Sequence, residues 1–144
     1  MISAVIGTRA QLIKMAPVLR ELEHREVPVN LVFTGQHSDT MAGLLQEFGI
    51  TTPPRYVYDG PAVSGIGRML LWLPRVLFRL LRHRRHWLPR GGGPDVVLVH
   101  GDTFSTLLGA LAGRLAGVTV AHVEAGLRSF NLFHPFPEEI TRLL

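Results

Sequence analysis

Short apolar runs alternate with segments of helical spacing, and this alternation constrains the fold more than any other feature of the sequence. The apolar runs predict four buried strands: Ile2–Ile6, Val29–Thr34, Asp95–Val99 and Val118–Val123. A shorter strand is expected at Tyr56–Tyr58. Strands that alternate with helices usually form a parallel sheet covered on both faces. We therefore predict an α/β domain with a parallel sheet of this kind.

The segments between the predicted strands carry apolar residues at helical spacing. One helix is expected over residues 12–22, a second over 41–48 that ends at Gly49, and a third over 103–116 that stops at Gly117. The chain closes on Glu138–Leu144, which reads as the opening of a helix with Pro137 in its first turn. Because no capping signal follows, we expect the sequence to be a fragment of a longer protein.

The composition suits one globular domain. The chain has 144 residues, of which 47% are hydrophobic, enough for a core and inconsistent with disorder. It contains no cysteine, which excludes a disulfide framework and a thiolate metal site and fits a cytoplasmic protein. Gly7 and Thr8 end the first apolar run quickly, so it predicts a strand rather than a signal peptide.

One arginine-rich segment makes the chain basic. The net charge is +4, and seven arginines lie between Asp59 and Asp95 with no acid among them. Arg68, Arg75, Arg79 and Arg82 share one helical face, and Pro74 is expected to interrupt the apolar pattern. Membrane-surface contact by residues 68–86 is one interpretation. We favour a sheet-covering or subunit-facing helix, and we expect no nucleic-acid partner because no reader motif accompanies the arginines.

Polar side chains follow each predicted strand where a parallel sheet binds its ligands, at the carboxyl ends of the strands. Gly7-Thr8-Arg9 follows the first strand, with Lys14 one helical turn later. Thr34-Gly35-Gln36-His37, His100-Gly101-Asp102-Thr103 and Glu124-Ala125-Gly126-Leu127-Arg128 follow the others. These groups predict a site at one edge of the sheet.

Each of these residues also has a purely structural interpretation. In this interpretation Asp102 is the N-cap of the following helix, and Arg128 forms an ion pair with Glu124. Gly7 suits a simple turn. Glu138 and Glu139 suit the first turn of a helix, where the helix dipole favours acids.

Four blocks resemble the non-hydrolysing UDP-N-acetylglucosamine 2-epimerases, in the same order along the chain: GTRAQLIKMAP, TGQH, PDVVLVHGDTFSTL and HVEAGLRSFNLFHPFPEE. The resemblance covers nearly all of the chain except the region from about residue 51 to residue 93. It implies a GT-B-type fold of two Rossmann-like halves, of which residues 1–144 are the N-terminal domain and the C-terminal UDP-binding domain is absent. It also implies that UDP-GlcNAc and UDP-ManNAc interconvert through elimination and re-addition of UDP, without a cofactor or a metal, in a homodimer.

The resemblance also assigns residues to this chemistry. Asp102, Glu124 and Glu138 match the family's catalytic acids. Five further residues match positions that bind the substrate: Arg9, Lys14, Gln36, His37 and Arg128.

The family's Pro-Glu after the opening arginine is Ala10-Gln11 here, and we expect this to alter the start of the helix rather than the chemistry. Since half of the cleft is missing, the isolated chain should not turn over. Two alternatives stay open: the acceptor half of a GT-B glycosyltransferase, which HVEAGLR disfavours, and a half-domain that binds nucleotide sugar or regulates an epimerase.

Overall fold

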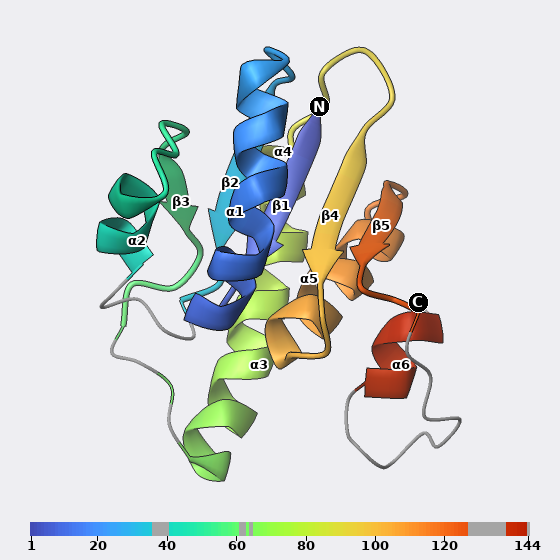
Figure 1. Ribbon diagram of the computed structural model, residues 1–144. Coiled ribbons are helices and arrows are strands. Elements are labelled where there is room, and N and C mark those ends of the chain that lie inside the picture. Colours follow the sequence, from blue (N-terminus) through green and yellow to red (C-terminus); the bar gives the residue numbers. More distant parts are fainter. Residues whose placement is uncertain (36–40, 61–62, 64, 127–137, 144) are drawn as a thin grey trace.

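Five parallel strands form one sheet, with the first strand at its centre (Figure 1). The computed structural model describes residues 1–35, 41–60, 63, 65–126 and 138–143. The sheet has the order β3-β2-β1-β4-β5, and every neighbouring pair is parallel. The strands are β1 (Ile2–Ile6), β2 (Val29–Phe33), β3 (Pro54–Tyr56), β4 (Val96–His100) and β5 (Thr119–Val123). The predicted parallel sheet is therefore confirmed, and its first strand is central.

Helices cover both faces of this sheet. They are α1 (Arg9–His24), α2 (Met41–Glu47), α3 (Ile66–Arg82), α4 (Arg84–Trp87), α5 (Phe104–Leu115) and α6 (Glu138–Leu143). The helices predicted over 12–22, 41–48 and 103–116 are confirmed within a few residues. Gly49 and Gly117, which follow α2 and α5, both have the positive φ typical of a helix end.

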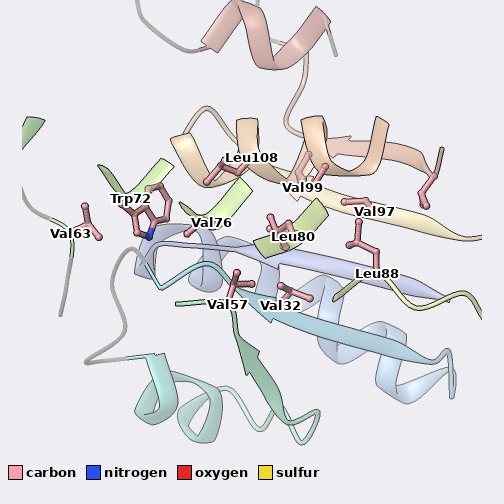
Figure 2. Close-up of a cluster of buried hydrophobic side chains, with 13 residues drawn as sticks. Val32, Val57, Val63, Trp72, Val76, Leu80, Leu88, Val97, Val99 and Leu108 are labelled. Atoms are coloured by element: carbon pink, nitrogen blue, oxygen red, sulfur yellow. The ribbon is translucent and has the colours of Figure 1, made fainter. Parts of the chain in front are cut away.

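Alternation along β1 explains the two cores. Ala4 and Ile6 point to one face and pack with residues of α1 and α2, including Leu12 and Met41. Val5 points to the other face and joins a cluster built with α3 and α5. Figure 2 shows this cluster. That cluster contains Val32, Trp72, Val76, Leu80, Val97, Val99 and Leu108.

Helix α3 continues through its proline. It runs without a break from Ile66 through Pro74 to Arg82, so Pro74 interrupts the apolar pattern of the sequence but not the helix. Pro74 lies on the exposed face, where water is available to a backbone carbonyl that loses its partner. On the opposite face, Trp72, Val76 and Leu80 are buried against the sheet, so α3 is the sheet-covering helix that we favoured. Within the described part of the chain, no helix combines the length and apolarity that crossing a membrane requires.

The short strand β3 also differs slightly from its prediction. It begins at Pro54 and ends at Tyr56, two residues earlier than expected. Proline lacks a backbone N–H and is tolerated at the first residue of an edge strand. The amide of Val57 still donates to the carbonyl of Phe33, which continues the pairing beyond β3.

Candidate functional site

A small pocket opens at the carboxyl edge of the sheet, where β1, β4 and β5 end. Its volume is about 240 Å³, which is less than most small-molecule sites enclose. Its lining comes from the start of α1 and from the residues that follow β4 and β5: Thr8, Ala10, Gln11, Lys14, His100, Gly101, Asp102, Thr103 and Glu124. Three residues that the sequence placed in the site, Lys14, Asp102 and Glu124, are therefore brought together.

Gln11 lines this pocket and forms hydrogen bonds to two of the turns around it. Its side chain is buried, and its Oε1 accepts hydrogen bonds from the backbone amides of Gly7 and Thr8, at 2.9 and 3.2 Å. Its Nε2 donates to the carbonyl of His100 at 2.7 Å and to Oγ1 of Thr106 at 2.8 Å. One amide thus joins the turn after β1 to the turn after β4. Our expectation that Gln11 affects only the start of the helix was too narrow.

The start of α1 shows why these residues suit the turn. Thr8 is the N-cap of α1, and its side chain accepts from the amide of Gln11, completing a capping box. A Cβ atom on Gly7 would lie 1.7 Å from Oγ of Ser105 and 2.5 Å from Oγ1 of Thr34. Gly7 is therefore required by close packing against α5 and the end of β2, and not merely by a turn.

Glu124 is held between two basic side chains. Its Oε2 lies 2.9 Å from Nζ of Lys14 and 3.3 Å from Nε2 of His100. The hydrogen bond from Lys14 is the main cause that keeps the pKa of the Glu124 carboxyl below its usual range, and the charges of both neighbours add to it. Lys14 and His100 are thus its partners in the described residues; Arg128, which we weighed as a partner, lies outside them.

The backbone of Glu124 is unusual as well. Its φ of 63° lies in the left-handed region, which is rare for a residue other than glycine. Such strain persists only where surrounding contacts hold the residue, and it is frequent at functional sites. The conformation turns the chain directly after β5 and brings the carboxylate back to the ends of β1 and β4.

Asp102 lines the pocket and does not cap α5. The N-cap is Thr103, whose hydroxyl accepts from the amide of Thr106 at 3.3 Å. Gly101, with a φ of 68°, turns the chain between β4 and Asp102 and leaves the carboxylate exposed. The capping interpretation of Asp102 is therefore wrong.

The remaining predicted residues are placed less fully. Arg9 is the first residue of α1 and is exposed, between Thr8 and Ala10 of the pocket lining. Glu138 begins α6, but its side chain is outside the described set, as are residues Gln36, His37 and Arg128. Glu139 is only 3% exposed.

His100 stands in the loop that the sequence analysis listed after the apolar run Asp95–Val99, but it was assigned no role there, and the structure places it in the pocket lining. The residue is 4% exposed, and it ends β4, where an apolar residue would be equally suited to the strand. The signal available in the sequence was an ionisable residue at the end of an apolar run, one position before the Gly-Asp turn.

Comparison with known proteins identifies the family. A family model described as UDP-N-acetylglucosamine 2-epimerase matches residues 20–144. The UDP-N-acetylglucosamine 2-epimerase of Methanocaldococcus jannaschii is 36% identical over 99% of this chain and 36% of its own length. A UDP-2,3-diacetamido-2,3-dideoxy-D-glucuronate 2-epimerase of Pseudomonas aeruginosa is 38% identical over 99% of this chain and 38% of its own.

The fold agrees with these matches. The crystal structure of UDP-GlcNAc 2-epimerase from Neisseria meningitidis bound to UDP-GlcNAc aligns with a TM-score of 0.77 and 31% identity, over 99% of this chain and 37% of that one. The chain thus has the Rossmann-like fold of part of a GT-B-type structure, and it spans little more than a third of the length of these relatives. With the family model matching residues 20–144, this chain belongs to the UDP-N-acetylglucosamine 2-epimerase family.

Proposed function

We propose that this chain supplies the N-terminal half of the active site of a non-hydrolysing UDP-N-acetylglucosamine 2-epimerase. The reaction interconverts UDP-GlcNAc and UDP-ManNAc by eliminating UDP and adding it back to the other face of the sugar. One observation carries the proposal: in a chain of this family, Asp102 and Glu124 share a pocket with Lys14 at the carboxyl edge of the sheet. The relative from Neisseria meningitidis binds UDP-GlcNAc.

The proposed chemistry needs a base at C2, an acid, and cations for the leaving diphosphate. Asp102, Glu124 and Glu138 are the proposed catalytic acids. Lys14 and His100 lower the pKa of Glu124, so this carboxylate is ionised near neutral pH. We propose it as the base because it is able to accept a proton in that state. The lowered pKa of Glu124 does not suit proton donation near neutral pH, and we therefore propose Asp102 or Glu138 as the acid.

Five residues are proposed to bind the nucleotide sugar: Arg9, Lys14, Gln36, His37 and Arg128. Lys14 and Arg9 flank the start of α1, whose N-terminus also favours negative charge. Fixed cations and a helix N-terminus at this position suit the diphosphate that leaves during elimination.

The rest of the cleft is proposed to come from a C-terminal domain that binds UDP. This matches the chain's share of about a third of its relatives' length, and it accounts for a pocket too small to enclose a nucleotide sugar. Residues 1–144 then act as the N-terminal domain. We place the protein in the cytoplasm, because a chain without cysteine suits a reducing compartment.

We further propose that the complete enzyme is a homodimer whose subunits meet at α3. Leu70, Leu71 and Phe78 of this helix are 64, 59 and 65% exposed. At 100° per residue these side chains fall within about 100° of one another, so they form one apolar strip. Arg75, Arg79 and Arg82 border that strip and suit the wet rim of an interface.

Deuterium incorporation at C2 of UDP-GlcNAc in D₂O tests the function. We expect none with the 144-residue chain alone, and incorporation together with UDP-ManNAc when the chain is co-expressed with the C-terminal domain of a family member. Incorporation by the isolated chain would contradict the half-site model. If only UDP-2,3-diacetamido-2,3-dideoxy-D-glucuronate reacts, the substrate is wrong but the reaction class stands. Tight binding without exchange would favour the regulatory half-domain instead.

A further inference from the structure

His100 is buried without the partners that a buried imidazole needs. The residue is 4% exposed, and among the described residues neither Nδ1 nor Nε2 has a hydrogen-bond partner of good geometry. A buried polar atom left unpaired destabilises the folded chain. An apolar side chain would avoid that cost at the end of β4, so the imidazole requires an explanation.

Among the described residues, the carboxylate that lies within ion-pair distance of the ring is that of Glu124. Nε2 of His100 lies 3.3 Å from Oε2 of Glu124, within ion-pair distance although the alignment falls short of a hydrogen bond. The side chain of Glu124 is 49% exposed and that of His100 only 5%. A small rotation of the exposed carboxylate would therefore complete the hydrogen bond, while the ring stays where it is.

The backbone holds this ring in place. The carbonyl of His100 accepts from Nε2 of Gln11 at 2.7 Å and from the hydroxyl of Thr106 at 2.6 Å. His100 also pairs with Val123 in the parallel ladder between β4 and β5, directly before Glu124. These contacts fix the backbone of His100. Its ring is therefore able to hold the carboxylate of Glu124, whose backbone is strained.

We propose that His100 is a positioning residue that donates from Nε2–H to Glu124 and holds this carboxylate in the pocket. The neutral Nε2–H tautomer leaves only an acceptor, Nδ1, unpaired, whereas the imidazolium would leave a buried N–H donor without a partner. Neither ring nitrogen is exposed, so His100 acts through Glu124 and forms no hydrogen bond to the substrate.

The mobility of Lys14, the other partner of Glu124, explains why two partners are useful. Lys14 binds the same Oε2, but its side chain is 54% exposed and long, so it is able to turn toward an anionic leaving group. When Lys14 turns away, His100 keeps the carboxylate in place. This step rests on the function proposed above; the contact between His100 and Glu124 does not.

NMR on the 144-residue chain tests the contact without any activity. Three charged or titratable groups share the pocket with Glu124, namely Lys14, His100 and Asp102, so the titration of the Glu124 side-chain carboxyl is followed in variants at matched salt. We expect His100→Leu to raise the pKa of Glu124, and His100→Gln to keep it low because the glutamine amide replaces the Nε2–H donor. His24→Leu, at an exposed histidine of α1, should leave this titration unchanged.

An unchanged Glu124 titration in a natively folded His100→Leu chain would overturn the proposal. If that variant does not fold, ¹⁵N shifts of the wild-type ring at pH 8.5 decide: the Nε2–H tautomer supports the role, and the Nδ1–H tautomer refutes it. In the completed enzyme we expect His100→Leu to lower kcat about tenfold or more with little change in KM, and His100→Gln to restore most of it. A wild-type enzyme without epimerase activity would refute the proposed function and leave the NMR result standing.

Discussion

Nζ of Lys14 lies 2.9 Å from Oε2 of Glu124, so a hydrogen-bonded ion pair joins α1 to the end of β5 across 110 positions of sequence. The pair lies at the same edge of the sheet where Gln11 joins the turn after β1 to the turn after β4. These contacts make the pocket a consequence of the fold, and each can be tested by substitution.

The ion pair predicts a pH-dependent contribution to stability. The pKa of Glu124 is lowered in the folded chain from its usual 4.5, so the pair stabilises the fold above that value, and the contribution is lost as the pH falls through the lowered pKa. We expect Lys14→Met to lower the urea midpoint at pH 7 and to have less effect at pH 3. The effect should be small and should shrink with salt, because both side chains are about half exposed.

The matched control for this experiment is Arg20→Met, which removes another exposed cation of α1. It should lack the pH dependence seen with Lys14→Met. An equal loss for Lys14→Met at pH 7 and pH 3 would show that the lysine stabilises the chain by packing rather than by its charge.

Gln11 predicts a larger and pH-independent loss of stability. Gln11→Leu leaves the amides of Gly7 and Thr8 and the carbonyl of His100 without this partner, at about 1–3 kcal/mol for each group that stays buried and unpaired. We expect a loss of roughly 2 kcal/mol or more in urea unfolding. Gln46→Leu, at an exposed glutamine of α2, is the matched control and should change little.

The variant Gln11→Glu distinguishes the contribution of the side-chain acceptor from that of the side-chain donor. A carboxylate keeps the acceptor for Gly7 and Thr8 but cannot donate to the carbonyl of His100. We expect a loss between those of wild type and Gln11→Leu, recovered partly at acid pH, where a protonated carboxyl regains a donor. Stability equal to wild type at pH 7 would show that the bond to His100 contributes nothing.

Glu124 and Gln11 illustrate how much of such a site can be predicted from the sequence. The order of polar residues after each apolar strand predicted that Asp102 and Glu124 would share an edge of the sheet, since parallel strands carry their carboxyl ends to one side. The T-x-x-Q spacing of Thr8 and Gln11 signals a capping box. Nothing local indicates that the same amide also binds the turn after β4, because that partner lies 89 positions away.

The same limit applies to His100 and Pro74. Burial of the His100 ring follows from packing of β4 between β1 and β5, which a one-dimensional apolar pattern does not specify. Proline is normally unfavourable inside a helix, but the buried face of α3 outweighs this preference. Tertiary contacts thus decided the features that the sequence analysis missed.

The exposed strip of α3 predicts the assembly of the completed enzyme. We expect Leu71→Glu and Phe78→Glu each to convert a dimer into a monomer in analytical ultracentrifugation, because a buried unpaired charge opposes association. Leu115→Glu, at a 57% exposed leucine of α5, should leave the dimer intact. A monomeric wild type that binds anionic vesicles through α3 would support the membrane-surface interpretation instead.

The carboxylates of the site give the last prediction, for the completed enzyme. Replacing Asp102, Glu124 or Glu138 by its amide should lower kcat on the order of a hundredfold or more, the usual scale for a lost acid or base. Replacing Glu139 should lower kcat far less, since on a helix it points about 100° away from Glu138. Its side chain is only 3% exposed, so we expect Glu139→Gln to reduce thermal stability. An inactive but stable Glu139→Gln enzyme, with Glu138→Gln near normal, would show that the two roles are exchanged.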